Sequence, residues 1–240
     1  MCTNRERILA LQPQIAEWFA SKGWAPRAHQ LDVLEASEAG ASALLIAPTG
    51  AGKTLAGFLP TLNDLIANPR KGLHTLYISP LKALAVDVQR NLMTPISEMG
   101  LGLKVEARTG DTPSHRRQRQ RFDPPNILLT TPEQLALLLS HGDSARLFAG
   151  LRRIVIDELH AMVTNKRGEL LSLGLARLGT LAPELRITAL SATVAHPELL
   201  RDWIATPVPD AEARLLIGQG GARPDIAILK TEEYVPWAGH

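Results

Sequence analysis

The sequence predicts an α/β fold with a mainly parallel central sheet flanked by helices on both faces. Short apolar runs alternate along the chain with longer segments of helical periodicity, the order typical of parallel strands joined by crossover helices. One run, 43–46, leads into a glycine-rich turn and then a helix, while another, 154–156, ends in two adjacent acids. In such sheets the loops at the carboxyl ends of the strands carry the functional residues.

Composition narrows the class of protein. The 240 residues can bury a sizeable core, and we expect one large domain. The 26 basic and 24 acidic residues nearly cancel, so any contact with nucleic acid must come from a local patch. The single cysteine, Cys2, excludes an internal disulfide, and zinc is equally unsupported. Without a long apolar run or a signal-like N-terminus, we expect a cytoplasmic protein that has no membrane contact.

The remaining elements follow from periodicity and turn signals. Strands are predicted at 43–46, 73–79, 103–108, 126–130, 153–156, 186–190 and 214–217, with a strand-like piece at 226–229. Helices are predicted at 5–20, 26–38, 55–67 and 82–96, from a cap at Asp111 or Thr112 to 121, from Pro132, and at 169–181 and 196–204.

The segment 47–54 reads as a phosphate cradle between a strand and a helix. Glycines let the backbone bend so that successive N–H groups point inward, and the new helix adds its positive dipole end. Lys53 would reach the β and γ phosphates, and the Thr54 hydroxyl would bind the Mg²⁺ that bridges them. A chance glycine turn is the alternative, but the flanking strand and helix favour phosphate binding. The residues assigned to the nucleotide are Gln30, Pro48, Thr49, Gly50, Ala51, Gly52, Lys53 and Thr54.

Gln30 lies shortly before this loop and carries both an amide donor and an acceptor. That pair is what reading the Hoogsteen edge of adenine requires. A glutamine on a helix is, taken alone, more often a solvated residue.

The acids Asp157 and Glu158 follow a buried strand, where two carboxylates are costly to bury without a cation or partner. In a P-loop NTPase an acid at this place holds Mg²⁺, and the next acid orients and deprotonates the attacking water. We therefore predict Lys53, Asp157 and Glu158 as catalytic residues, with Thr54 and Asp157 as metal ligands. A pair of surface acids is the alternative.

Three other strand ends run into loops or helix starts that could hold the phosphates of a nucleic acid. The residues assigned to this contact are Pro80, Leu81, Lys82, Gly110, Asp111, Thr131 and Pro132. The arginine-rich run 115–121 is either a solvated helix face or a further backbone contact, and the sequence leaves both open. We assign His160, Ser191, Ala192 and Thr193 to coupling, because hydroxyl groups at a strand edge can bond the neighbouring acids and sense the γ phosphate.

The motifs at 48–54, 80–84, 131–133, 157–160 and 191–193, in this order, resemble the first RecA-like domain of a superfamily 2 helicase of the DExH-box type. The resemblance covers residues 15–225. Gln30 matches the family's adenine-reading glutamine, and Ala47 matches the usual opening of its phosphate loop. Residues 110–112, 166–168 and 236–240 look like the large helicase-related (Lhr) family, and within it the bacterial ligase-associated DNA damage response branch.

The resemblance implies an ATP-driven DNA helicase or translocase that moves 3′ to 5′, acts in DNA repair and binds single-stranded DNA or a forked duplex. It makes 1–224 the ATP-binding RecA-like domain and 225–240 a linker into a second RecA-like domain, which carries the arginine fingers. A ligase-associated repair set would supply further partners. The fragment alone is expected to be inactive.

Two other classes stay open. A P-loop ATPase that remodels protein or RNA would account for the phosphate loop and the acids, but it gives the helix starts at Lys82 and Pro132 no purpose. An isolated nucleotide-binding module without turnover is the second. Stimulation of ATP hydrolysis by single-stranded DNA would separate the first from a helicase, and turnover by the fragment would separate the second.

Overall fold

The computed structural model describes residues 10–207 and 212–218. Its strands are β1 (Ser42–Ile46), β2 (Thr75–Ile78), β3 (Val105–Ala107), β4 (Ile127–Thr130), β5 (Arg153–Ile156), β6 (Arg186–Ser191) and β7 (Ala213–Ile217). They form one seven-stranded sheet in the order β3-β4-β2-β5-β6-β1-β7. Every neighbouring pair is parallel, so the predicted fold class is confirmed.

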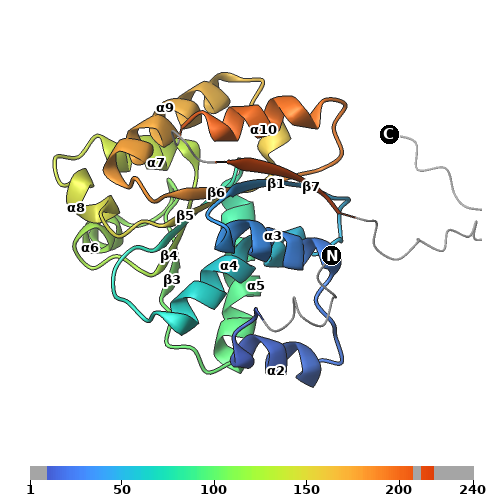
Figure 1. The fold of residues 1–240 in the computed structure, drawn as a ribbon. Coiled ribbons are helices and arrows are strands. Elements are labelled where there is room, and N and C mark those ends of the chain that lie inside the picture. The colour runs from blue at the N-terminus through green and yellow to red at the C-terminus, as the bar shows by residue number, and fades with distance from the viewer. Residues whose placement is uncertain (1–9, 208–211, 219–240) are drawn as a thin grey trace, which may run out of the picture.

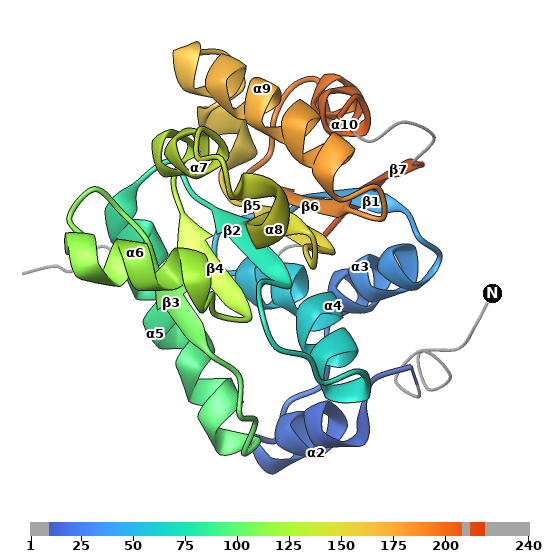
Figure 2. The same cartoon turned by 90° about the vertical axis from the view of Figure 1, so that its left-hand side faces the viewer.

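Helices cover both faces of the sheet (Figure 1). One layer contains α2 (Pro13–Ser21), α3 (Ala28–Glu38), α4 (Lys53–Ala67) and α5 (Lys82–Glu98). The other contains α7 (Pro132–Leu139), α8 (Ser144–Phe148), α9 (Lys166–Leu181) and α10 (Pro197–Ala205), while α6 (Ser114–Phe122) lies near the β3 edge. Figure 2 shows α5 passing β3 and β4 towards α2, where the Trp18 indole Nε1 donates to Glu98 Oε2 over 2.7 Å.

The two layers enclose two apolar cores, because successive side chains of a strand point to opposite faces. Leu45 belongs to the core under α3, α4 and α5, whereas Leu44 and Ile46 belong to the core under α7 and α9. All five residues of β1 are buried. The strand that leads into the phosphate loop is therefore held from both sides.

Some local predictions differ from the structure. Of the helix predicted at 5–20, the described part begins at Pro13, while residues 5–9 lie outside the described residues. The short helix α8 was not predicted from the sequence. The cap expected at Asp111 or Thr112 is wrong, because α6 begins after Pro113 and the Thr112 hydroxyl instead accepts from the Thr109 N–H at 2.9 Å. The strand-like piece 226–229, the segment 236–240 and the domain boundary at 224 lie outside the described residues.

Within the described ranges, no helix is both long and apolar enough to cross a membrane.

Gly57 lets α4 approach the sheet closely. A Cβ added at this position would lie 2.9 Å from Val155 Cγ1 and 3.2 Å from Leu190 Cδ1. Both partners are buried, so the contact can be relieved only by moving the helix or the strands. The glycine thereby allows the short distance between α4 and the sheet. That distance also sets the position of the phosphate loop, which directly precedes the helix.

Gly57→Ala should lower the free energy of unfolding by about 1 kcal/mol, because overpacking costs roughly 1–3 kcal/mol while the helix gains about 1 kcal/mol from alanine. Gly102→Ala is the matched control, since a Cβ there meets nothing within 4 Å. Urea unfolding of both variants checks the prediction. Equal stabilities would contradict the close approach.

Candidate nucleotide and nucleic-acid site

The predicted motifs all lie at the carboxyl edge of the sheet, because every strand is parallel. The strand order divides this edge into two halves. We call the ends of β1, β6 and β5 the P-loop half; they carry 47–54, 191–193 and 157–160. We call the ends of β2, β4 and β3 the outer half; they carry 80–82, 131–132 and 110–111.

The phosphate loop has the backbone that its glycines predict. Gly50 has φ 77° and Gly52 has φ 75°, a left-handed conformation that favours glycine, and α4 begins directly at Lys53. The Lys53 side chain is buried, and its Nζ donates to the carbonyl oxygens of Ala47 at 2.8 Å and Pro48 at 3.1 Å. The ammonium group thus lies inside the loop, where an anion would be bound.

Residues from the start of α3 hold the back of this loop. Arg27 Nη1 donates to Gly50 O at 3.2 Å, Gln30 Nε2 donates to Gly52 O at 3.3 Å, and His29 Nε2 lies 2.9 Å from Ala51 O. Carbonyl and N–H groups of one peptide point in opposite directions, so the N–H groups of Gly52 and Lys53 face away from α3. This is the arrangement that a phosphate cradle needs.

Gln30 therefore has a second part in the site. Its side chain is buried, and its Oε1 accepts from the Arg27 N–H at 2.9 Å while its Nε2 is bonded to the loop. The predicted contact with adenine requires one of these bonds to exchange. The sequence signalled Gln30 but neither Arg27 nor His29, since nothing local to 27–29 indicates that they meet the loop.

A cavity of about 430 Å³ opens beside Gly52 and Thr54. Its wall includes Trp18, Trp24 and Phe58, and the Trp24 side chain is 58% exposed. An apolar, aromatic wall next to a phosphate cradle suits a planar heterocycle. This surface was missed by the sequence analysis, which assigned no role to either tryptophan.

Asp157 is buried, with both carboxylate oxygens bonded. The Tyr77 hydroxyl donates to Oδ2, and the Glu158 N–H donates to Oδ1 at 3.0 Å. Burial and the neighbouring Asp157 raise the pKa of Tyr77 well above its ordinary value, so the phenol stays a donor across the physiological range. Tyr77 lies in the middle of an apolar run, where no local pattern indicates this contact.

Glu158 has φ 48°, the only positive φ of a non-glycine residue in the part of the chain that the structure describes. Such a backbone costs on the order of 1 kcal/mol or more and clusters at functional sites. About a third of the Glu158 side chain is exposed, whereas Asp157 is buried. Adjacent acids thus have different environments, as their predicted roles require.

Three of the four predicted coupling residues meet beside these acids. His160 Nδ1 lies 3.0 Å from Ser191 Oγ and accepts from the Ala192 N–H at 3.4 Å, and Glu158 Oε2 is 3.5 Å from the same nitrogen. Thr193 follows and is exposed. The end of β6 is therefore in contact with the loop that follows β5.

In the outer half, an ion pair joins the ends of β2 and β3. Lys82 Nζ lies 2.7 Å from Asp111 Oδ2, and both side chains are largely exposed. Such a pair stabilises the fold little and is easily exchanged for a phosphate contact. Gly110 stands in open space, and Leu81 is 56% exposed. Thr131 and Pro132 begin α7, as predicted.

The outer half also contains a buried cation that was missed by the sequence analysis. Arg108 is 3% exposed, and its Nη1 donates to the Arg117 carbonyl at 2.7 Å. Burial, with the neighbouring Arg117 and Arg121, lowers the pKa of Arg108 to about 10, which keeps the guanidinium charged at neutral pH. It directly precedes the 109–111 loop.

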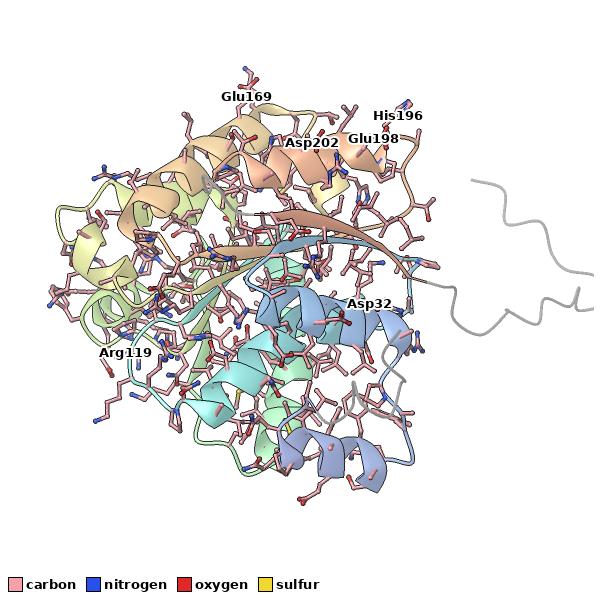
Figure 3. All side chains as sticks on the ribbon, in the orientation of Figure 1. Asp32, Arg119, Glu169, His196, Glu198 and Asp202 are labelled. Carbon is pink, nitrogen blue, oxygen red and sulfur yellow. The ribbon has the colours of Figure 1, made fainter. Side chains whose placement is uncertain are left out.

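The arginine-rich helix α6 is partly neutralised within the fold. Arg119, which Figure 3 marks on the α6 side of the molecule, lies 2.5 Å from Glu106 Oε2. Arg121 lies 2.6 Å from Asp143 Oδ1. Of the two interpretations left open for this run, the paired arginines favour the solvated helix face over a contact with nucleic acid.

A phosphate loop after β1, an acid pair after β5 and an all-parallel sheet together define a RecA-like nucleotide-binding domain. Residues 27–201 match the DEAD/DEAH box helicase family, and the chain belongs to that family.

Two relatives support the resemblance to Lhr helicases. The Lhr helicase/probable uracil glycosylase of Mycolicibacterium smegmatis is 42% identical over 208 residues, covering 80% of this chain and 14% of the relative. The ATP-dependent helicase Lhr-Core of Methanocaldococcus jannaschii is 40% identical over 210 residues, covering 81% and 25%. The chain thus spans at most a quarter of the length of these relatives.

Solved structures of helicases resemble this chain in fold as well as in sequence. The Mycobacterium smegmatis helicase Lhr bound to single-stranded DNA and AMP-PNP matches with a TM-score of 0.82 at 37% identity, over 90% of this chain and 28% of that one. The helicase MrfA bound to DNA matches with a TM-score of 0.75 at 29% identity, over 87% and 30%. The predicted resemblance to Lhr-type helicases is confirmed.

Tyr77→Phe should lower the free energy of unfolding by about 1–3 kcal/mol, because a buried carboxylate loses a hydrogen-bond donor. Urea unfolding measures the loss. A double-mutant cycle with Asp157→Asn is the control, and the effect of Tyr77→Phe should shrink in that background. An unchanged effect would show that the phenol acts elsewhere.

Proposed function

We propose that this chain is the ATP-binding domain of a Lhr-type DNA helicase or translocase that hydrolyses ATP with Mg²⁺. The observation that carries the proposal is the strand order, which sets the phosphate loop and the acid pair on the two sides of β6. Neighbouring strands are about 4.8 Å apart, so the ends of β1 and β5 are separated by roughly 10 Å. A triphosphate and its metal can span that separation.

The residues present fit this ligand. The N–H groups of Gly52 and Lys53, together with the dipole of α4, would hold the phosphates, and the Lys53 ammonium would exchange two carbonyl contacts for phosphate oxygens. Mg²⁺ is usually bound through one or two carboxylates, a hydroxyl and substrate phosphates, which Thr54 and Asp157 suit. When bound, it would neutralise phosphate charge.

Glu158 is the group that we assign to the attacking water. Its partly exposed carboxylate can accept a proton from water, whereas Asp157 is buried and already accepts two hydrogen bonds. His160 lies between Glu158 and Ser191, so the end of β6 can respond to the state of the acid. The aromatic wall at Trp18 and Trp24 would receive the adenine, and we assign Gln30 to its polar edge.

We propose that a single DNA strand crosses the outer half. Lys82, the exposed loop at 110–111 and the start of α7 offer a side-chain cation and backbone N–H groups to phosphates, and Arg108 adds charge behind them. The Lhr helicase of similar structure is bound to single-stranded DNA, which supports this choice over protein or RNA. A forked duplex would present the same strand.

The finer assignments rest on the family resemblance. We propose 3′ to 5′ movement, a part in DNA repair within the bacterial ligase-associated branch, and a cytoplasmic location. We further propose that a second RecA-like domain completes the ATP site with an arginine, since phosphoryl transfer needs positive charge on the γ phosphate.

Glu158→Gln, in the protein that carries this chain, should keep Mg²⁺–ATP binding but lower kcat by about 10²–10⁴, because it removes the base and preserves size. Lys53→Ala should lose ATP binding itself. Fluorescent-nucleotide titration and steady-state ATPase assays separate the two effects. Glu169→Gln, which changes an acid on α9, is the control and should match the wild type. Equal loss of binding in both site variants would contradict the division of roles.

Residues 1–240 expressed alone should fold yet show no hydrolysis that rises with single-stranded DNA. The reason is that an arginine finger contributes on the order of 10³–10⁵ in rate and is assigned to the second domain. An ATPase assay with and without oligo(dT) tests this. DNA-stimulated turnover that disappears in Lys53→Ala would disprove it.

A further inference from the structure

Arg167 joins parts of the carboxyl edge that lie far apart in the sequence. Its Nη1 donates to the Pro80 carbonyl at 2.6 Å, and its Nε donates to the Glu133 carboxylate. Pro80 lies in the loop after β2, two residues before Lys82, and Glu133 directly follows Thr131 and Pro132. One guanidinium therefore connects two of the loops assigned to nucleic acid.

The planar guanidinium suits this position. Nε and Nη1 are held in one rigid fork, so the two acceptors are fixed relative to each other. The hydrogen bond from Arg167 lowers the pKa of Glu133 despite partial burial, and it raises the pKa of Arg167. Both groups stay charged at neutral pH.

Arg167 is also connected to the loop after β5, residues 157–160, which we call the acid loop. The Asn165 side chain accepts from the Arg167 N–H at 2.9 Å and donates from Nδ2 to Ala161 O at 2.9 Å. Ala161 ends the short helix η1 (Leu159–Ala161), which begins directly after Glu158. Hydrogen bonds thus lead from the outer half to the residue that we assign to the attacking water.

Gly168 lets the start of α9 lie close to the backbone that follows η1. A Cβ at this position would lie only 2.4 Å from the Met162 carbonyl oxygen and 2.9 Å from Val163 Cα. Both neighbours are backbone atoms of the segment after η1, so a larger residue would force the start of α9 away. Farther along α9, a Cβ on Gly174 would be 3.2 Å from Leu135 Cδ2, which shows how closely α9 packs on α7.

We propose that Arg167 is a positioning residue that fixes the spacing of the 80–82 and 131–133 loops for a nucleic-acid backbone and links them to the Glu158 loop. The inference rests on the proposed function, and it adds a residue that touches neither ATP nor the reacting phosphate. Binding of a DNA strand across both loops would then change the position of the acid loop through the hydrogen bonds of Asn165.

A direct phosphate contact by Arg167 is the competing explanation, and the two differ in measurable ways. A phosphate ligand contributes its charge, so lysine would replace it well and its loss would reduce the salt slope of DNA binding by about one. A positioning residue contributes geometry. Lysine cannot reach two fixed acceptors as a fork, so Arg167→Lys should behave like Arg167→Gln.

The test uses the protein that carries this chain, with Arg167→Gln, Arg167→Lys and the control Lys166→Gln, which removes a positive charge one residue away. The concentration of oligo(dT) that half-saturates ATPase stimulation should rise roughly tenfold in both Arg167 variants, while KM for ATP stays within about twofold. The salt slope should be unchanged, and Lys166→Gln should match the wild type.

Three results would overturn the proposal: a wild-type half-saturating oligo(dT) concentration in Arg167→Lys, a salt slope of DNA binding reduced by about one, or a Lys166→Gln effect equal to that of the Arg167 variants. Amide hydrogen exchange without DNA provides a separate measure, because the segments 79–85 and 131–137, each a strand end and the following helix start, should exchange faster in both Arg167 variants only. Unchanged exchange would also overturn it. If oligo(dT) does not stimulate ATP hydrolysis by the wild type, the proposed function is contradicted. Hydrogen exchange would then still show whether Arg167 positions the two loops.

Discussion

The parallel direction of all the strands is the constraint on which the site depends. Because each strand starts at the same edge, every carboxyl end emerges at the opposite edge, and the six loops that carry predicted motifs are brought together there. An antiparallel strand in the middle of the sheet would send its loop to the wrong edge. Helices bury both faces of the inner strands, which agrees with the largely apolar sequences of β1, β2, β4 and β5.

The phosphate loop is held by contacts behind it as well as by its glycines. Arg27, His29 and Gln30 bond successive carbonyl oxygens of the loop, which orients the N–H groups towards the ligand side before any ligand arrives. Such preorganisation lowers the cost of ordering the loop on binding. Gln30 thus has a structural role in holding the phosphate loop, in addition to the adenine contact assigned to its amide.

The acid loop combines two opposite requirements. Asp157 is buried and accepts hydrogen bonds from the Tyr77 hydroxyl and the Glu158 N–H, while Glu158 has a left-handed backbone and a partly exposed side chain. Two adjacent acids can therefore differ in role because their surroundings differ. The same loop continues through η1 to α9, where Arg167 contacts Pro80 and Glu133, so its position is tied to the outer half.

The sequence by itself determined the order of strands and helices, the phosphate loop, the acid pair and the helix start at Pro132. Each of these is encoded by residues close together in the chain, through periodicity, glycine and proline. Only the tertiary structure decided that Tyr77 meets Asp157, 80 positions away, and that Arg167 meets Pro80, 87 positions away. Tyr77 lies inside an apolar run, and Arg167 was noticed only within the family-like segment 166–168, so nothing local indicated either partner. Their contacts arise from strand order and helix packing, which no local pattern specifies.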